Sequence, residues 1–262
     1  MKRLSGKNAF ISGSSRGIGL ACAKALAEQG ANVFLVATNE VLLKEAKSVI
    51  QQRSAVQVGS HAVDLRTLEG CQQASYQFLE QFGQADILIN SAGATKGGIF
   101  PEQSDEEMID GFALKFHGAV RLCRQLWPSL KQSKGTVINI VGGAARSPSR
   151  DFMVGGSVNA ALANFSKALA AQGLVDDVNV NWILPGMTET ERMERLLEGK
   201  AKMQNKTKEE VRADSIRLEG IRRLGLPEDV AELVVFLCSP AARLILGAGI
   251  PVDGGSGKGY YC

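Results

Sequence analysis

Short, almost continuous apolar runs alternate along the chain with longer stretches in which apolar residues recur at helical spacing. The short runs predict buried strands, and the longer stretches predict amphipathic helices. The expected strands are Asn8–Ser12, Asn32–Ala37, Val56–Val63, Ile87–Asn90, Thr136–Val141, Val178–Leu184 and Ile250–Val252. The expected helices cover residues 16–28, 40–51, 67–82, 105–131, 157–172 and 227–239, and a more polar helical segment covers 188–220.

The regular alternation of the two element types predicts an α/β fold. Strands that are apolar on both faces are typical of a parallel sheet with helices on both sides. We therefore expect residues 1–262 to form a single doubly wound, Rossmann-type domain with about seven strands. The polar segment 188–220 is expected to be an insertion within this domain that acts as a lid over the substrate.

The composition is that of an ordinary globular chain, since 45% of its 262 residues are hydrophobic and 22% are charged. The net charge of +3 is small and spread along the chain, so we expect neither a nucleic-acid partner nor a membrane surface. No apolar run reaches membrane-spanning length and the first residues lack a signal-peptide core, which predicts a cytoplasmic protein. With two histidines and no closely spaced cysteine pair, no metal site is expected.

A glycine-rich turn, Gly13-Ser14-Ser15-Arg16-Gly17-Ile18-Gly19, follows the first expected strand and opens the first expected helix. Glycines at such a junction allow the backbone to approach a pyrophosphate, which the N–H groups and the positive dipole end of the helix bind. The turn therefore predicts a dinucleotide cofactor, although a tight turn without a ligand would show the same spacing. Ligands of such sheets lie beyond the carboxyl ends of the strands, so residues that follow other strands are the next candidates.

Several of those residues form short motifs. Asp64 and Leu65 follow the third expected strand, Asn90-Ser91-Ala92-Gly93 ends the fourth, and Pro185-Gly186 follows the sixth. With the glycine turn and the segments Arg223–Asp229 and Val252–Gly255, these motifs resemble the short-chain dehydrogenase/reductase family, in particular its 3-oxoacyl-(acyl-carrier-protein) reductase-like members. The resemblance implies cofactor contacts from Gly13, Ser15, Arg16, Gly17, Ile18, Gly19, Thr38, Asp64, Leu65, Asn90, Ala92, Gly93, Pro185, Gly186, Thr188 and Thr190.

The end of the second expected strand bears on the choice of cofactor. A carboxylate at this position binds the ribose 2′-hydroxyl of NAD and would repel the 2′-phosphate of NADP. Ala37 and Thr38 stand there instead, while Ser15 and Arg16 could contact a 2′-phosphate. We therefore expect NADP(H) in preference to NAD(H). NAD(H) stays open, because the arginine by which the family usually selects NADP is missing at Thr38.

Members of the family use a catalytic Asn, Ser, Tyr and Lys, and all four matching positions differ in this chain. The position of the tyrosine is Gly155, that of the lysine is Asn159, that of the serine is Gly142 and that of the asparagine is Lys115. Lysine and asparagine are thus exchanged. We expect Lys115 and Asn159 to form a rebuilt catalytic site in which Lys115 supplies an ammonium group near the ribose or the substrate. The alternative is that Lys115 extends to solvent.

These features predict an NAD(P)(H)-dependent oxidoreductase that acts on a small carbonyl or alcohol substrate through a non-standard proton-transfer site. One alternative is a catalytically inactive nucleotide-binding pseudoenzyme that serves as a regulatory or structural subunit, and another is a non-redox enzyme on the same scaffold. Loss of a general acid typically costs about 10² to 10⁴ in rate, so weak reduction could survive it. The resemblance also implies a homo-oligomer, either a tetramer or a dimer.

Overall fold

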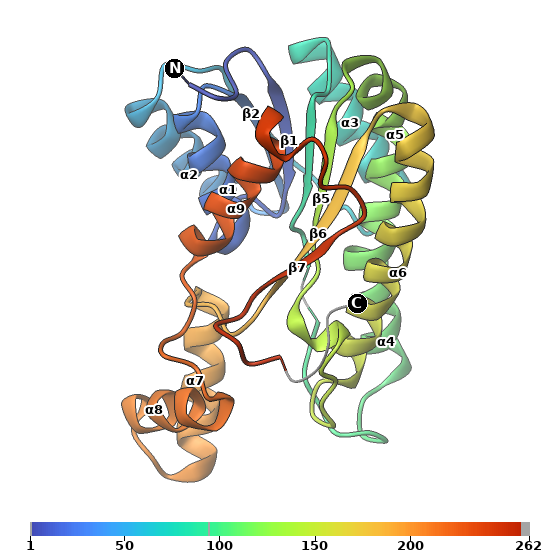
Figure 1. Ribbon diagram of the computed structural model, residues 1–262. Helices are drawn as coiled ribbons and strands as arrows, with labels where there is room; N and C mark the ends of the chain where they lie inside the picture. Colours follow the sequence, from blue (N-terminus) through green and yellow to red (C-terminus); the bar gives the residue numbers. More distant parts are fainter. Residues whose placement is uncertain (1, 94, 258–262) are drawn as a thin grey trace.

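Seven parallel strands form one sheet in the computed structural model, which describes residues 2–93 and 95–257 (Figure 1). The strands lie in the order β3-β2-β1-β4-β5-β6-β7, so the direction of winding changes between β1 and β4. This is a doubly wound arrangement, and the predicted α/β class is confirmed. The strands are β1 (Asn8–Ser12), β2 (Asn32–Ala37), β3 (Val58–Ala62), β4 (Ile87–Asn90), β5 (Thr136–Ile140), β6 (Asn179–Pro185) and β7 (Gly249–Val252).

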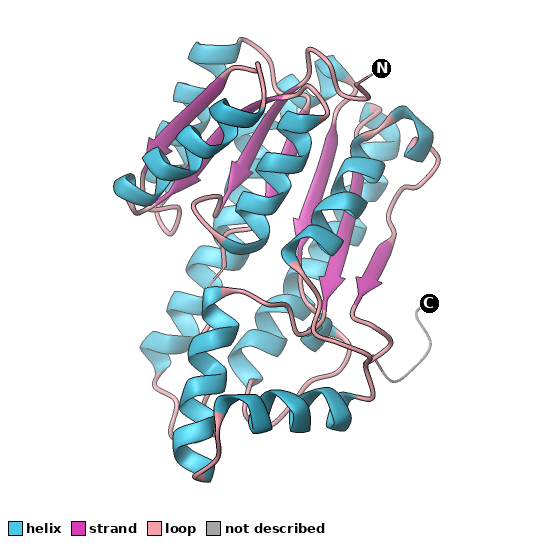
Figure 2. Ribbon diagram, turned by 90° about the vertical axis from the view of Figure 1, so that its left-hand side faces the viewer, coloured by secondary structure: helices cyan, strands magenta, loops and turns pink. Residues whose placement is uncertain are grey.

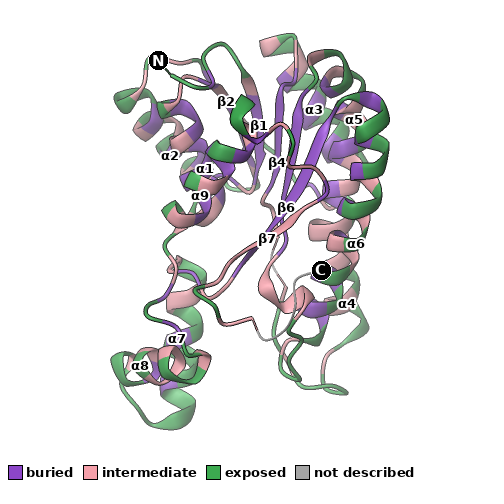
Figure 3. Ribbon diagram, in the orientation of Figure 1, coloured by how far each residue is buried: buried purple, intermediate pink, exposed green. Residues whose placement is uncertain are grey.

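Helices cover both faces of the sheet (Figure 2). One face carries α1 (Gly17–Glu28), α2 (Glu40–Arg53) and α9 (Pro227–Cys238). The other face carries α3 (Leu68–Phe82), α5 (Ala119–Ser133) and α6 (Met153–Asp176). The central strands are buried between the two layers, and this core fixes where their carboxyl ends lie (Figure 3). Among the described residues, none of the helices is both long and apolar enough to span a membrane.

Two helices differ from the prediction in ways that affect the site. The helix expected at 105–131 consists of α4 (Asp105–Gly111), a π-helical segment η1 (Phe112–Gly118) and α5. A π-helical turn holds an additional residue, so regular helical spacing does not give the direction of the Lys115 side chain within η1. The helix expected from residue 157 begins at Met153 instead, because Gly155 and Gly156 have low helix propensity and obscured its first turn.

The segment 188–220 forms α7 (Glu191–Gln204) and α8 (Lys208–Glu219), which extend from the sheet at the end where the strands terminate (Figure 1). The two helices pack on each other through a small apolar cluster that includes Leu197 and Val211. The hydroxyl of Thr190 accepts a hydrogen bond from the backbone N–H of Met193 and caps α7. The cap fixes the start of α7 close to the predicted cofactor residues. That this segment acts as a lid stays a prediction.

Candidate functional site

The glycine-rich turn lies between the carboxyl end of β1 and the N-terminus of α1. Gly13 and Gly17 have φ angles of 66° and 55°, which glycine adopts most readily. A Cβ atom at Gly13 would lie 2.7 Å from the Cα of Ala92, and one at Gly19 would overlap the carbonyl oxygen of Gly13. The first turn of α1 carries no acidic residue that would compete for its N–H groups. The turn therefore fits a bound pyrophosphate.

Other predicted cofactor residues lie at the same edge of the sheet. The hydroxyl of Ser12 accepts hydrogen bonds of 3.1 Å from the backbone N–H groups of Ser91 and Ala92, which joins the end of β4 to β1. Beyond β6, the methyl group of Thr190 would lie 3.4 Å from a Cβ atom at Gly17. The structure thus brings together predicted residues that follow β1, β4 and β6.

The side chains of three predicted cofactor residues have protein partners. Asn90 is buried, and its Nδ2 donates a 2.8 Å hydrogen bond to Oδ1 of Asn139, which links β4 to β5. Leu65 is buried in the core and can offer only its backbone to a ligand. The carboxylate of Asp64 accepts a 2.9 Å hydrogen bond from the backbone N–H of Arg66 and pairs with its guanidinium at 3.2 Å. These contacts give Asn90 and Leu65 a structural role in addition to any contact through the backbone.

The surroundings of Arg16 bear on the choice between NADP and NAD. Its guanidinium forms a 3.0 Å ion pair with Glu191 at the start of α7, and the two side chains are 48% and 63% exposed. Exposed pairs of this kind contribute little to stability, so a phosphate could replace the carboxylate. Thr38, beyond the end of β2, is exposed. The next acid, Glu40, is paired with Lys44 at 2.8 Å within α2.

Lys115 lies in η1, and its side chain runs along Gly93 toward β5. A Cβ atom at Gly93 would lie 2.9 Å from Cδ of Lys115, so the glycine leaves room for the lysine stem. The Nζ atom donates a hydrogen bond to the carbonyl oxygen of Val141, which follows β5. Burial, followed by the positive charge of Arg192, lowers the pKa of Lys115 to about 7. The amine is therefore directed into the site, and the alternative that it extends to solvent is not observed.

Asn159 reaches the same turn from α6. The residue is only 4% exposed, and its Nδ2 would lie 3.0 Å from a Cβ atom at Gly142. Gly142 has a φ of 121°, a value that other residues rarely adopt. Within residues 2–93 and 95–257, Oδ1 of Asn159 has no hydrogen-bond donor, and a buried carbonyl oxygen needs one from water or a ligand. Lys115 and Asn159 thus approach the Val141–Gly142 turn from two different helices.

The side chain of Phe152 covers Gly155. A Cβ atom at Gly155 would overlap the Phe152 ring, so this ring occupies the space into which a side chain at position 155 would project. The guanidinium of Arg192 lies over the same ring, with its carbon 5.7 Å from the ring centre. Arg192 also donates a 2.8 Å hydrogen bond to the carbonyl oxygen of Thr95. The first turn of α7 therefore contacts both Phe152 and the loop after β4.

Sequence reasoning did not predict Arg192 as a site residue. Arg192 comes two residues after Thr190, and only the tertiary position of α7 shows that it faces this edge of the sheet.

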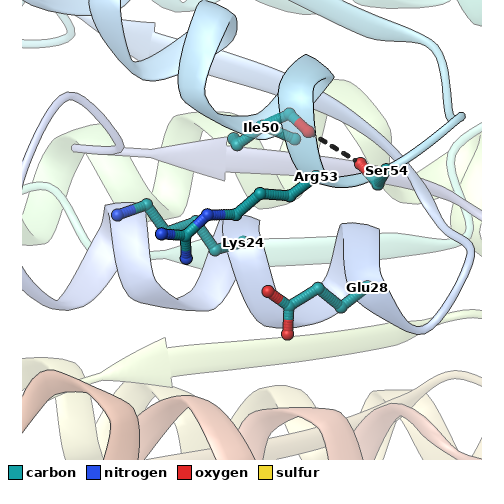
Figure 4. A pocket seen from close by; sticks show the side chains of 5 residues that line it. All are labelled: Lys24, Glu28, Ile50, Arg53 and Ser54. Carbon is teal, nitrogen blue, oxygen red and sulfur yellow. Dashed lines mark hydrogen bonds between the residues drawn. The ribbon is translucent and has the colours of Figure 1, made fainter.

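A narrow hollow lies far from these residues. It is lined by Lys24 and Glu28 of α1 together with Ile50, Arg53 and Ser54 at the end of α2 (Figure 4). The ends of these helices lie where the strands begin, opposite the predicted cofactor residues. The hollow is too narrow for a water molecule, and the hydroxyl of Ser54 is already bonded to the carbonyl oxygen of Ile50 at 3.0 Å. It offers no competing site.

Comparison with known proteins agrees with this geometry. Residues 13–257 match the family model described as enoyl-(acyl carrier protein) reductase. The uncharacterized oxidoreductase MT0954 of Mycobacterium tuberculosis is 34% identical over 259 residues, which cover 97% of this chain and 94% of that protein. The 3-oxoacyl-(acyl-carrier-protein) reductase FabG of Chlamydia trachomatis is 28% identical over 252 residues, which cover 95% of this chain and 96% of that protein.

Solved structures extend the likeness to three dimensions. The crystal structure of L-sorbose reductase from Gluconobacter frateurii, complexed with NADPH and L-sorbose, is 34% identical and superimposes with a TM-score of 0.95. The superposition covers 99% of this chain and 100% of that one. Sequence and structure therefore agree over nearly the whole length, and the chain belongs to the short-chain dehydrogenase/reductase family of NAD(P)-dependent oxidoreductases.

Proposed function

We propose that this protein is an NADP(H)-preferring oxidoreductase of a small carbonyl or alcohol substrate in which Lys115 carries the transferred proton. The observation that carries the proposal is the hydrogen bond from Nζ of Lys115 to Val141, beside the turn that Asn159 reaches from α6. In members of the family a serine, a tyrosine and a lysine serve this region. Here Gly142, Gly155 and Asn159 take those positions, and the amine arrives from η1 instead.

The cofactor would be held by the glycine turn and by the segments after β4 and β6. The close approach of Gly13 to Ala92 and of Gly17 to Thr190 leaves backbone groups, rather than side chains, to meet a pyrophosphate. The absence of a carboxylate at Ala37 and Thr38, together with the position of Arg16, supports NADP(H). The NADPH found with the L-sorbose reductase supports the same choice. When bound, the nicotinamide supplies or accepts a hydride.

The protein's own part in the reaction is to orient the substrate and move a proton. A lysine whose pKa is near 7 exists in both protonation states at neutral pH, which is the condition for an efficient general acid or base. The ammonium form would donate its proton to a carbonyl oxygen that is being reduced, and the neutral amine would accept the proton of an alcohol. Asn159 would orient the substrate or a water through its unpaired Oδ1.

A second candidate function is a nucleotide-binding protein without redox turnover. The observation that favours it is the Phe152 ring, because a phenyl group in the space beside Gly155 can transfer no proton. Such a protein would bind NADP(H) at the same glycine turn and act as a regulatory or structural subunit. For either function we expect a dimer or tetramer, with α7 and α8 as a lid over the substrate.

Stopped-flow measurement of NADPH separates the two functions. The full chain is saturated with NADPH, mixed with ketones and 3-oxoacyl thioesters, and followed through a single turnover. Lys115→Met should retain NADPH binding but slow the oxidation of NADPH by about 10²- to 10⁴-fold. Lys47→Met, on α2 and far from the site, is the control and should match the wild type. Binding without oxidation by any carbonyl compound would support the second function, and no binding would contradict both.

Substitution of Arg16 tests the cofactor preference separately. Arg16→Met should weaken NADPH binding by about 10-fold or more, because it removes a charged hydrogen-bond donor from the 2′-phosphate. NADH binding should change by less than about 2-fold. Fluorescence titration of both cofactors provides the measurement, and equal weakening of both would show that Arg16 does not read the 2′-phosphate.

A further inference from the structure

Arg192 is positioned to bind a ligand that enters the site. It lies in the first turn of α7, with its guanidinium carbon 5.7 Å from the centre of the Phe152 ring. One of its N–H groups is bonded to the carbonyl oxygen of Thr95 at 2.8 Å. A guanidinium has several further N–H donors arranged in a plane, which suit the two oxygens of a carboxylate or phosphate. Arg192 is exposed to solvent, so a substrate can reach it.

Lys115 brings a second positive charge to the same loop. Its stem lies against Gly93, while Arg192 is bonded to Thr95, so both cations contact the segment that follows β4. Their charges interact, because Arg192 contributes to the lowered pKa of Lys115. Among residues 2–93 and 95–257, neither cation has a carboxylate within ion-pair distance.

Several nearby cations have acidic partners. Arg16 pairs with Glu191 at 3.0 Å, directly beside Arg192 in sequence. Within the segment 188–220, Lys208 pairs with Glu194 at 2.7 Å. Two acids of α4 are likewise engaged, since Lys96 pairs with Glu107 at 3.1 Å and Arg66 pairs with Asp110 at 2.5 Å. These acids are therefore not available to neutralise Arg192 and Lys115.

We propose that the substrate carries an anionic group, a carboxylate or a phosphate, which Arg192 binds while Lys115 faces the carbonyl oxygen. The proposal rests on the oxidoreductase function above and names its substrate class: oxo acids or phosphorylated ketones, together with the corresponding hydroxy compounds. An anion between two like charges removes their repulsion, and a bidentate pair with Arg192 fixes the orientation of the carbonyl group.

The cofactor and Lys115 together supply the hydride and the proton that the reduction needs. The hydride of NADPH forms a new C–H bond at the carbonyl carbon, and the π bond of the carbonyl becomes an O–H bond with the proton of the Lys115 ammonium. The products are the hydroxy compound, NADP⁺ and neutral Lys115, which regains a proton from solvent. The anionic group on Arg192 keeps its charge throughout, so it provides binding and orientation only.

Matched pairs of substrates test this proposal. Initial rates of NADPH oxidation are measured for 2-, 3- and 4-oxo acids and their methyl esters, and for a ketose and its phosphate. The anionic member of at least one pair should have a kcat/KM about 10- to 100-fold higher than its neutral partner. Arg192→Met should abolish that preference, while Arg195→Met, a matched arginine on the same helix, should change it by less than about 2-fold. Comparison of the oxo acids with the ketose phosphate shows whether the site prefers a carboxylate or a phosphate.

Direct binding separates a failure of this proposal from a failure of the oxidoreductase function. Calorimetry measures the binding of hydroxy acids and phosphate to the complex of the protein with NADP⁺. Binding that depends on Arg192 without any turnover would support the anion site and contradict the oxidoreductase. Turnover of neutral ketones with no preference for anions would contradict the anion site alone. If Arg192→Met instead weakens NADPH binding, Arg192 serves the cofactor and the proposal is wrong.

Discussion

The two ends of α6 carry polar clusters that are built in opposite ways. At the C-terminal end, the carboxylate of Asp176 accepts hydrogen bonds from Trp127 at 2.9 Å, Lys131 at 2.6 Å and Gln172 at 2.7 Å. At the N-terminal end, Asn159 has a buried oxygen without a donor. Beside it, Lys115 is bonded to a backbone carbonyl and has no carboxylate partner among the described residues.

The pKa values of Asp176 and Lys115 reflect this difference between the two clusters. Hydrogen bonds from Lys131, Trp127 and Gln172 lower the pKa of Asp176 to about 2, far from neutrality, so its charge is constant in the cell. Burial lowers the pKa of Lys115 to about 7, so its charge changes with small changes in surroundings. A fully satisfied cluster holds α5 and α6 together, whereas an incompletely satisfied one leaves groups available for a ligand.

The largest effect should be the pH dependence of hydride transfer. In the proposed mechanism, reduction needs the charged form of Lys115, so its rate should fall as pH rises through about 7, and the rate of alcohol oxidation should rise over the same range. An arginine at this position keeps its positive charge over the whole pH range. Lys115→Arg should therefore remove the pH dependence of the rate. Single-turnover rates between about pH 5 and pH 9 provide the measurement. An unchanged pH profile in Lys115→Arg would show that another group carries the proton.

The next effect concerns the Phe152 ring. Gly155→Ala should lower the free energy of unfolding by about 1–3 kcal/mol, because the added methyl group overlaps the ring. In a Phe152→Ala background the same substitution should cost almost nothing. Gly199→Ala on α7, where an added Cβ meets open space, is the control and should be slightly stabilising. Urea denaturation of the four variants tests the coupling, and additive effects would contradict the packing described.

Substitution of Asp176 should change the stability of the protein and leave its activity unchanged. Asp176→Asn should lower Tm by several degrees at neutral pH and leave the rate of NADPH oxidation unchanged. Because the pKa of Asp176 is lower in the folded protein, its stabilising effect is present above about pH 4 and is lost as pH falls toward about 2. The difference in Tm between Asp176→Asn and the wild type should therefore shrink over that window. A constant difference would indicate that the charge is unimportant.

The smallest expected effect is a gain in thermal stability. Lys115→Met should raise Tm by about 2–4 °C near pH 6, because the wild type keeps a partly buried ammonium without a carboxylate partner. The pKa of Lys115 is lower in the folded protein, so the cost of its charge is full below about pH 7 and declines as pH rises toward the ordinary value. The gain should accordingly be smaller at pH 9. A loss of stability would mean that the lysine contributes to the core.

Sequence patterns predicted the strands well, because apolar runs are local signals. The sequence also singled out Lys115 and Asn159 as a pair of candidate residues. The pattern could not show that both side chains reach the Val141–Gly142 turn, since η1 changes the helical register. Arg192 was missed because its place depends on how α7 packs against the loop after β4, which no local pattern encodes.

The φ of 121° at Gly142 limits which residues this position can accept. A serine introduced there would be strained and would press on Asn159, just as a tyrosine at position 155 would collide with Phe152. Either change alone should therefore lower the stability of the protein, unless the backbone at Gly142 or the position of the Phe152 ring changes with it.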